Sequence, residues 1–207
     1  MNLQSISAVW SHLFHVTAAA NLSSISRSRV LWPAKTLLEM ADRPELVRQR
    51  RTENLSVVID SREVLLRNQI PLNPELLDLG TTYTLEDYVM CLNSYVFFWP
   101  GNIDGPRYDA MRMFEKTAAI GAVSLRVPTH SLVEKIGSWA TYVTTCNTGV
   151  TWTEQGTKAR RGPEVFQSIE AFSTNPSLIQ EICFQSEVFL PPNTEWGCGP
   201  GGPWTAL

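Results

Sequence analysis

The stretch Leu13-Phe-His-Val-Thr-Ala-Ala-Ala-Asn-Leu-Ser-Ser-Ile25 decides how the start of the chain folds. Its first five residues include two β-branched residues and one phenylalanine around one histidine, which is typical of a short strand. From residue 18 onward the stretch becomes rich in alanine, and Leu22 and Ile25 follow at helical spacing. We therefore predict a strand over 13–17 that leads directly into a helix.

The rest of the chain mixes short strand and helix patterns without a regular order. Thr84 stands three residues before Asp87, a variant of the capping box that predicts a helix from Thr84 to about Asn93. The apolar run 95–99 is typical of a strand buried on both faces, and Pro100-Gly101 predicts its end. Similar patterns predict a buried strand over 55–59, strands over 121–127, 142–145, 150–153 and 182–190, and helices over 34–40, 104–119, 128–135 and 164–171. This mixture indicates an α+β fold rather than a doubly wound sheet.

Length and composition are those of an ordinary globular chain. The 207 residues are 43% hydrophobic and 18% charged, which excludes a disordered or fibrous protein. Because no linker divides the chain, we predict a single domain over residues 1–207, with a flexible Gly/Pro-rich tail at 193–207. The formal net charge of −3 excludes a global positive field that would recruit nucleic acid.

The cysteines and the apolar runs bear on metal binding and location. The four cysteines are far apart and form no CxxC pair, so we predict reduced, mostly buried thiols and no metal site. The N-terminus lacks a basic segment before its apolar residues, and the longest apolar run, 95–99, is too short to span a bilayer. We expect a cytoplasmic protein with no membrane partner.

The sequence lacks the catalytic motifs that have a strong local signature. It contains no GxSxG, GxxxxGK[ST], GxGxxG or HExxH pattern, which argues against serine hydrolases, P-loop enzymes, Rossmann dehydrogenases and zincins. Of the three histidines, His15 draws attention because it lies in a predicted core strand, just before Asn21. One interpretation is a buried histidine bonded to the backbone, with Asn21 as a local helix cap. The other is a functional site.

The stretch 13–25 resembles the opening of the DarT-type ADP-ribosyltransferases, in which a strand carrying His-x-Thr is followed by Asn-Leu-x-x-Ile on a helix. Later segments resemble an uncharacterised bacterial domain family with the same layout. These segments are Leu66–Leu72, Leu92–Trp99, Asn147–Gly149, Arg161–Phe166 and Ser186–Leu190. The matches are short but follow one another in order over about residues 13–190.

The resemblance implies a fold and a reaction. The fold would be ADP-ribosyltransferase-like, a split pair of bent antiparallel sheets with short helices around an NAD cleft. The reaction would transfer ADP-ribose from NAD with loss of nicotinamide, through an oxocarbenium-like ribose that needs a fixed substrate and stabilisation of its positive charge. Glu187 occupies the family's position for the carboxylate that bonds the nicotinamide ribose and accepts a proton from the acceptor. Strand alternation alone is also compatible with a solvent-facing Glu187.

The resemblance assigns further residues to NAD. His15 and Thr17 would contact the adenosine-side ribose or the nicotinamide amide, and Asn21 would orient the dinucleotide. Asn147 belongs to the same set of cofactor-binding residues. Phe98, together with the neighbouring tryptophan, would wall the nicotinamide pocket, although an aromatic strand of this kind is also typical of a core.

An arginine is expected to hold the pyrophosphate or steer the acceptor, because a guanidinium binds phosphate through two parallel hydrogen bonds. Arg67 is our first choice and is assigned to the catalytic set with Glu187. Arg51, which ends the basic run 43–51, is the alternative, and the other interpretation of that run is a solvated helix face.

The acceptor stays open between several classes. DarT proteins modify bases in single-stranded DNA, and such binding needs a basic groove. Two groups of basic residues, 48–51 and 158–161, could supply local patches for single-stranded DNA, RNA or a nucleotide, and protein or small-molecule acceptors also remain. The family context suggests a toxin or defence effector with a possible antitoxin partner. The alternatives are an NAD glycohydrolase, a related transferase acting on phosphorylated RNA ends, or a catalytically inactive interaction module.

Overall fold

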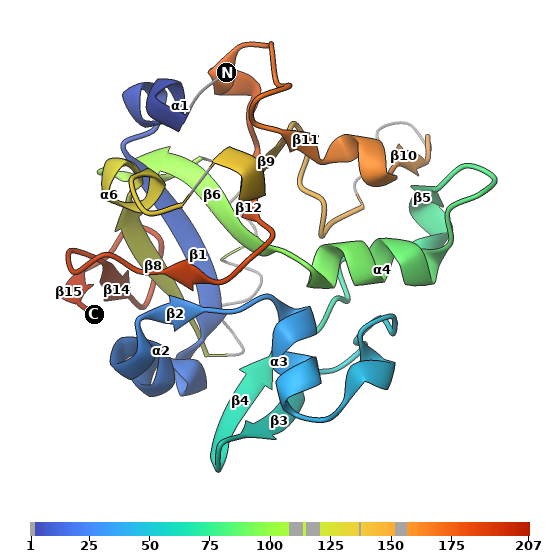
Figure 1. Cartoon of the computed structure of the whole chain (residues 1–207), viewed down its shortest axis with the longest axis horizontal. Helices are drawn as coiled ribbons and strands as arrows, with labels where there is room; N and C mark the ends of the chain where they lie inside the picture. The colour runs from blue at the N-terminus through green and yellow to red at the C-terminus, as the bar shows by residue number, and fades with distance from the viewer. Residues whose placement is uncertain (1–2, 108–113, 115–120, 137, 152–156) are drawn as a thin grey trace.

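One antiparallel sheet carries most of the strands (Figure 1). The computed structural model describes residues 3–107, 114, 121–136, 138–151 and 157–207. Within these residues the sheet has nine strands in the order β11-β9-β12-β6-β1-β8-β14-β15, with β7 paired to β6. They are β1 (His12–Ala18), β6 (Val96–Asn102), β7 (Gly105–Pro106), β8 (Ala122–Pro128), β9 (Thr141–Thr144), β11 (Gln167–Ser168), β12 (Glu181–Phe184), β14 (Glu195–Gly197) and β15 (Thr205–Ala206).

Short helices and three two-stranded pairs surround this sheet. The pairs are the antiparallel β3 (Leu55–Ile59) with β4 (Arg62–Leu66) and β2 (Val30–Leu31) with β13 (Val188–Phe189), and the parallel β5 (Leu77–Asp78) with β10 (Ala159–Arg160). The α-helices of the described residues are α1 (Leu3–Val9), α2 (Leu22–Ser28), α3 (Ala34–Met40), α4 (Leu85–Asn93) and α6 (Thr129–Val133). Turns of 3₁₀ helix cover Ala19–Asn21, Pro44–Leu46, Pro74–Leu76, Ser138–Ala140, Pro163–Val165 and Pro176–Leu178. This arrangement confirms the predicted α+β class.

Strand β1 organises the centre of the sheet, as the opening stretch predicts. It pairs with β8 along its whole length, from His12 opposite Pro128 to Ala18 opposite Ala122, and with β6 on its other edge. Apolar residues of β1, β6, β8 and β12 form the largest core cluster, in which Phe98 and Phe184 are fully buried and their rings meet edge to face. Burial of this apolar surface is the main force that stabilises the fold.

Local sequence signals are confirmed where they are strongest. The helix predicted over 34–40 is α3, with the same bounds. At α4, the Thr84 hydroxyl accepts a hydrogen bond from the Asp87 backbone N–H, and the Asp87 carboxylate accepts one from the Thr84 N–H, so the capping box forms as predicted. The strands at 121–127 and 142–145 and the helix at 128–135 appear as β8, β9 and α6, with slightly shifted bounds.

The predicted end of the aromatic strand is wrong. Strand β6 continues through Pro100 and Gly101 to Asn102, because both residues lie in register with β1. Gly101 is required there by a close approach of the chain, since a Cβ at this position would come within 2.3 Å of the Gly105 carbonyl oxygen in β7.

Two further predictions fail because long-range pairing decides the outcome. The single strand predicted over 182–190 divides into β12, which pairs with β6 and β9, and β13, which pairs with β2, with a bend at 185–187 between them. The helix predicted over 164–171 is instead a 3₁₀ turn at Pro163–Val165 followed by β11 on the edge of the sheet.

The remaining differences concern exposed or partly described segments. Strand β3 is not a buried strand but half of a surface hairpin. Within β3 itself only Val57 is buried. The helix predicted over 104–119 begins instead with β7, and its later part lies largely outside the described residues, as do residues 152 and 153 of the strand predicted over 150–153. Residues 193–207, predicted as a flexible tail, instead supply β14, which pairs with β8, and β15.

Candidate functional site

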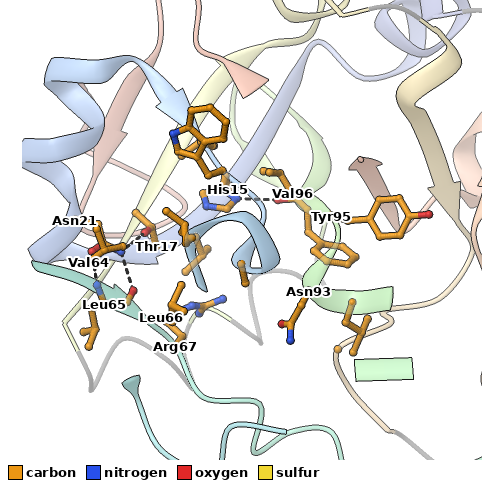
Figure 2. A pocket seen from close by; sticks show the side chains of 18 of the residues that line it. His15, Thr17, Asn21, Val64, Leu65, Leu66, Arg67, Asn93, Tyr95 and Val96 are labelled. Atoms are coloured by element: carbon orange, nitrogen blue, oxygen red, sulfur yellow. Dashed lines mark hydrogen bonds between the residues drawn. The ribbon is translucent and has the colours of Figure 1, made fainter. Parts of the chain in front are cut away.

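A cavity of about 520 Å³ lies between β1, β6, the β3–β4 hairpin, helices α2 and α3, and the segment Asn147–Val150 (Figure 2). Its volume is in the range of small-molecule and cofactor sites. Six of the eight predicted site residues line it: His15, Thr17, Asn21, Arg51, Arg67 and Asn147. His15 and Thr17 lie on β1, Asn21 lies in the turn that follows it, Arg51 and Arg67 flank the β3–β4 hairpin, and Asn147 follows β9.

His15 is held as a neutral ring with a defined tautomer. Its Nδ1 lies 2.9 Å from the Phe97 carbonyl oxygen, and because that oxygen can only accept, Nδ1 carries the hydrogen and Nε2 is left as an acceptor. Burial, helped by the charge of Arg67 and opposed by the Phe97 bond, lowers the pKa of His15 to about 4. His15 is therefore bonded to the backbone, as the structural interpretation predicted, and also lines the cavity.

Asn21 joins the first strand to the hairpin. Its side-chain N–H groups donate to the Thr17 hydroxyl oxygen at 3.2 Å and to the Leu65 carbonyl at 2.9 Å, and its Oδ1 accepts from the Leu65 N–H at 2.8 Å. The side chain forms no helix cap, so that prediction is wrong. Since both N–H groups are used, Asn21 positions β4 against β1 and leaves Oδ1 with spare acceptor capacity.

Replacing Asn21 with Ala is expected to lower the free energy of unfolding by about 2 kcal/mol, because the partly buried Leu65 amide and carbonyl groups lose their partners. Urea denaturation of the variant and wild type checks this value. Asn193→Ala, which removes only an exposed 3.4 Å contact to Ser131, serves as the matched control and should change stability by less than about 0.5 kcal/mol. Equal effects in both variants would show that Asn21 carries no structural bond.

Three arginines line the cavity: Arg62, exposed on the hairpin, and the more buried Arg51 and Arg67. Arg51 donates to the Asn93 Oδ1 at 3.0 Å and to the Arg67 carbonyl at 3.0 Å, and burial together with the charge of Arg67 lowers its pKa to about 10. Burial also lowers the pKa of Arg67. Within the described part of the chain, the Arg67 guanidinium has no hydrogen-bond acceptor, and Figure 2 shows its side chain beside the cavity. Two neighbouring positive charges, one of them unpaired, favour an anionic ligand.

Sequence reasoning missed the residues that support Arg51. Gln69 accepts from the Arg51 backbone N–H at 3.0 Å and donates to Asn93, and Asn93 also donates to the Val47 carbonyl at 2.8 Å. Asn93 is 2% exposed and ends helix α4 after its apolar face. A polar residue at this junction between α4 and β6 needs hydrogen-bond partners, and that need is the sequence signal that could have revealed it.

Two predicted residues lie outside the cavity lining. Phe98 is a core residue that packs against the rings of His15 and Phe184, whereas Trp99, which was predicted with it, does line the cavity, as does Phe97. Glu187 lies half-buried in the bend between β12 and β13, one residue before Val188, which pairs with the cavity-lining Leu31.

The carboxylate that does line the cavity is Asp60, at the exposed turn of the β3–β4 hairpin. A second depression, of about 390 Å³, adjoins the bend that contains Glu187. Its lining includes Ser186, Lys35 and Trp139.

The two predicted basic patches are partly neutralised. Arg48 forms an ion pair with Asp87 at 3.1 Å, and Arg160 pairs with Asp78 and Glu164 at 3.3 and 3.1 Å. Arg161 is 9% exposed and donates to backbone carbonyl groups of the Asn147–Val150 segment. These residues therefore do not form an open basic groove for a polyanion.

The cysteines, the metal-ligating side chains and the helices bear on the remaining predictions. All four cysteines are free, with Cys183 buried and Cys198 exposed. No group of three or more His, Cys, Asp or Glu side chains in the described ranges is arranged to hold a metal ion. Among the same residues, every helix is too short or too polar to cross a membrane.

The sequence that builds this cavity matches a known family model. Residues 11–189 match a family of unknown function, DUF7002. The chain belongs to this family. The matched range contains the whole cavity lining and Glu187, and it ends before β14 and β15. Searches of curated proteins and of solved structures found no match.

Proposed function

We propose that this DUF7002 protein is an NAD-dependent ADP-ribosyltransferase with an ADP-ribosyltransferase-like fold. The observation that carries the proposal is the unpaired Arg67 guanidinium beside Arg51 in a cavity walled by Phe97 and Trp99. A dinucleotide needs this combination, because its pyrophosphate is an anion and its rings stack on aromatic side chains. The order of sequence motifs over about residues 13–190 supports the same assignment.

The proposed chemistry breaks the bond between the ribose C1′ and the nicotinamide nitrogen. The electron pair leaves with nicotinamide, the acceptor nucleophile forms the new bond to C1′, and its proton passes to the Glu187 carboxylate. Arg51 and Arg67 together hold the pyrophosphate, and the neutral His15 offers Nε2 as an acceptor for a ribose hydroxyl. This assigns to each residue the contact that its charge and hydrogen-bonding capacity allow.

Hydrolysis of NAD is the second candidate function, because the neutralised arginines on the surface favour a small acceptor such as water. Both functions need the same cavity. They differ in whether ADP-ribose is transferred or released, so the analysis of products separates them.

The proposal is tested by incubating the protein with NAD labelled in its ADP-ribose part, together with single-stranded DNA, RNA and cell lysate. We expect nicotinamide release, and at 100 times the dissociation constant NAD should stabilise the fold by about 2.7 kcal/mol. Arg67→Met should weaken NAD binding at least about tenfold, because it removes a charge-assisted contact to phosphate.

Arg27→Met is the matched control, because Arg27 is exposed on α2 and does not line the cavity. It should bind NAD like the wild type. Absence of both NAD binding and nicotinamide release would contradict the proposal and favour an inactive interaction module.

A further inference from the structure

A buried carboxylate stands behind one wall of the cavity. Glu181 lies on β12, is 3% exposed and does not line the cavity itself. Its Oε2 accepts three hydrogen bonds: from the Thr148 N–H at 3.0 Å, from the Thr148 hydroxyl at 2.7 Å and from the Thr144 hydroxyl at 3.2 Å. Thr144 also lies 2.7 Å from the Cys146 carbonyl, so its single hydroxyl hydrogen serves one of the two acceptors at a time.

The segment that Glu181 holds forms part of the cavity. All four residues of the Asn147–Val150 segment line it, and Thr148 is fully buried. The other hydrogen bonds that the described part of the chain makes to this segment reach its carbonyl groups: Arg161 donates to Asn147 and Val150, and the Tyr88 hydroxyl donates to Thr148 at 2.9 Å. Glu181 therefore supplies the bond to the Thr148 amide and hydroxyl.

The surroundings of Glu181 make its charge sensitive to pH near neutrality. Burial raises its pKa to about 7, while the threonine bonds and the charge of Arg161 act in the opposite direction. The other titratable groups that face it are Tyr88 on α4, Cys146 in the segment before Thr148 and Cys183 on β12. Burial raises the pKa of each of these three groups, so they stay neutral while Glu181 titrates.

We propose that Glu181 is a positioning residue whose ionised carboxylate fixes the Asn147–Val150 wall of the cavity and whose protonation loosens it. Hydrogen bonds to a carboxylate are about twice as strong as those to a neutral acceptor, so the added proton weakens the bonds to Thr148 locally, even though the neutral group is easier to bury and the fold as a whole gains stability. Ligand affinity then falls as the pH falls, a consequence that rests on the proposed function when the ligand is NAD. The Arg161 and Tyr88 contacts keep the segment attached while it loosens.

Amide hydrogen exchange tests this without any ligand. The peptide that contains Thr148 is expected to lose protection by about tenfold between pH 8 and pH 6, after correction for the intrinsic pH dependence of exchange. Glu181→Gln, which mimics the protonated form, should show the lower protection at both pH values. Protection of β1 amides in the same sample reports whether the variant is folded.

Glu164→Gln is the matched control, because Glu164 is an exposed carboxylate paired with Arg160 outside the cavity lining. It should keep the pH dependence of the wild type. Equal wild-type protection of the Thr148 peptide at pH 6 and pH 8 would overturn the proposal, as would full protection in Glu181→Gln.

Titration calorimetry with NAD forms a second arm. The dissociation constant of the wild type should rise about fivefold to tenfold from pH 8 to pH 6, and that of Glu181→Gln should not change. His15 does not interfere, because its pKa of about 4 keeps it neutral across this range. If NAD fails to bind at every pH, the proposed function fails, while the exchange data still decide the role of Glu181.

Discussion

Glu187→Gln is expected to reduce nicotinamide release at least about 100-fold while changing the dissociation constant for NAD by less than about threefold. The substitution keeps the size of the side chain but removes the negative charge that would stabilise the oxocarbenium-like ribose, and a lost electrostatic contact of this type costs about 10² to 10³ in rate. Single-turnover measurement of nicotinamide release, paired with calorimetry for NAD, separates the two quantities.

Asp60→Asn is the control variant for Glu187→Gln. Asp60 lines the cavity, whereas Glu187 lies outside the lining in the bend before β13, so the two carboxylates are rival candidates for the proposed catalytic role. Asn tolerates the left-handed backbone at this turn, where φ is 49°, so the fold should not change. We expect Asp60→Asn to keep nicotinamide release within about threefold of the wild type. Loss of release in Asp60→Asn, with activity retained in Glu187→Gln, would move the catalytic carboxylate to the hairpin.

The parts of the fold that could be predicted from sequence are those fixed by neighbours in the chain. Helix α3 and the capping box at Thr84 follow from local spacing, and β1 follows from a run of β-branched and aromatic residues. The strand predicted over 182–190 fails because its two halves pair with different partners, and no local pattern specifies a partner. The β14 strand was missed for the same reason, since its pairing with β8 overrides a segment rich in glycine and proline.

The residues of the candidate site also divide into those that local sequence predicts and those that depend on distant partners. His15, Thr17 and Asn21 come together because they share one strand and its continuation, and Arg51 and Arg67 join them through the hairpin that Asn21 binds. Glu181 and Asn93 were missed because their importance lies in partners more than thirty residues away. Periodicity reports which residues are buried, and the hydrogen bonds of a buried polar group depend on the complete fold.

The largest effect on stability is expected from two buried groups whose pKa values are shifted in opposite directions. The pKa of Glu181 is raised from its ordinary value of 4.5 to about 7, and that of His15 is lowered from 6.5 to about 4. The stability that Glu181 contributes is complete below pH 4.5 and is lost as the pH rises to 7. The stability that His15 contributes is complete above pH 6.5 and is lost as the pH falls to 4.

Each contribution amounts to about 3 kcal/mol, and in the wild type the two largely cancel between pH 4.5 and 6.5. Glu181→Gln removes one of them. We therefore expect the free energy of unfolding of this variant to gain about 3 kcal/mol relative to the wild type between pH 4.5 and 7. His15→Gln should show the reverse, a relative gain of about 3 kcal/mol as the pH falls from 6.5 to 4. Urea denaturation across this pH range measures both differences.

The comparison between variants matters because surface carboxylates also titrate in this range. Hydrogen bonds to Thr84 and to the Gly80 amide lower the pKa values of Asp87 and Asp78, so the whole protein loses stability in acid. That background is common to the wild type and both variants, and it cancels in the differences. Parallel pH profiles for the wild type and Glu181→Gln would show that Glu181 ionises in the folded protein as easily as in the unfolded chain. A carboxylate that ionises so easily could not act as the pH-sensitive support of the cavity wall, so this measurement bears on stability and on the site together.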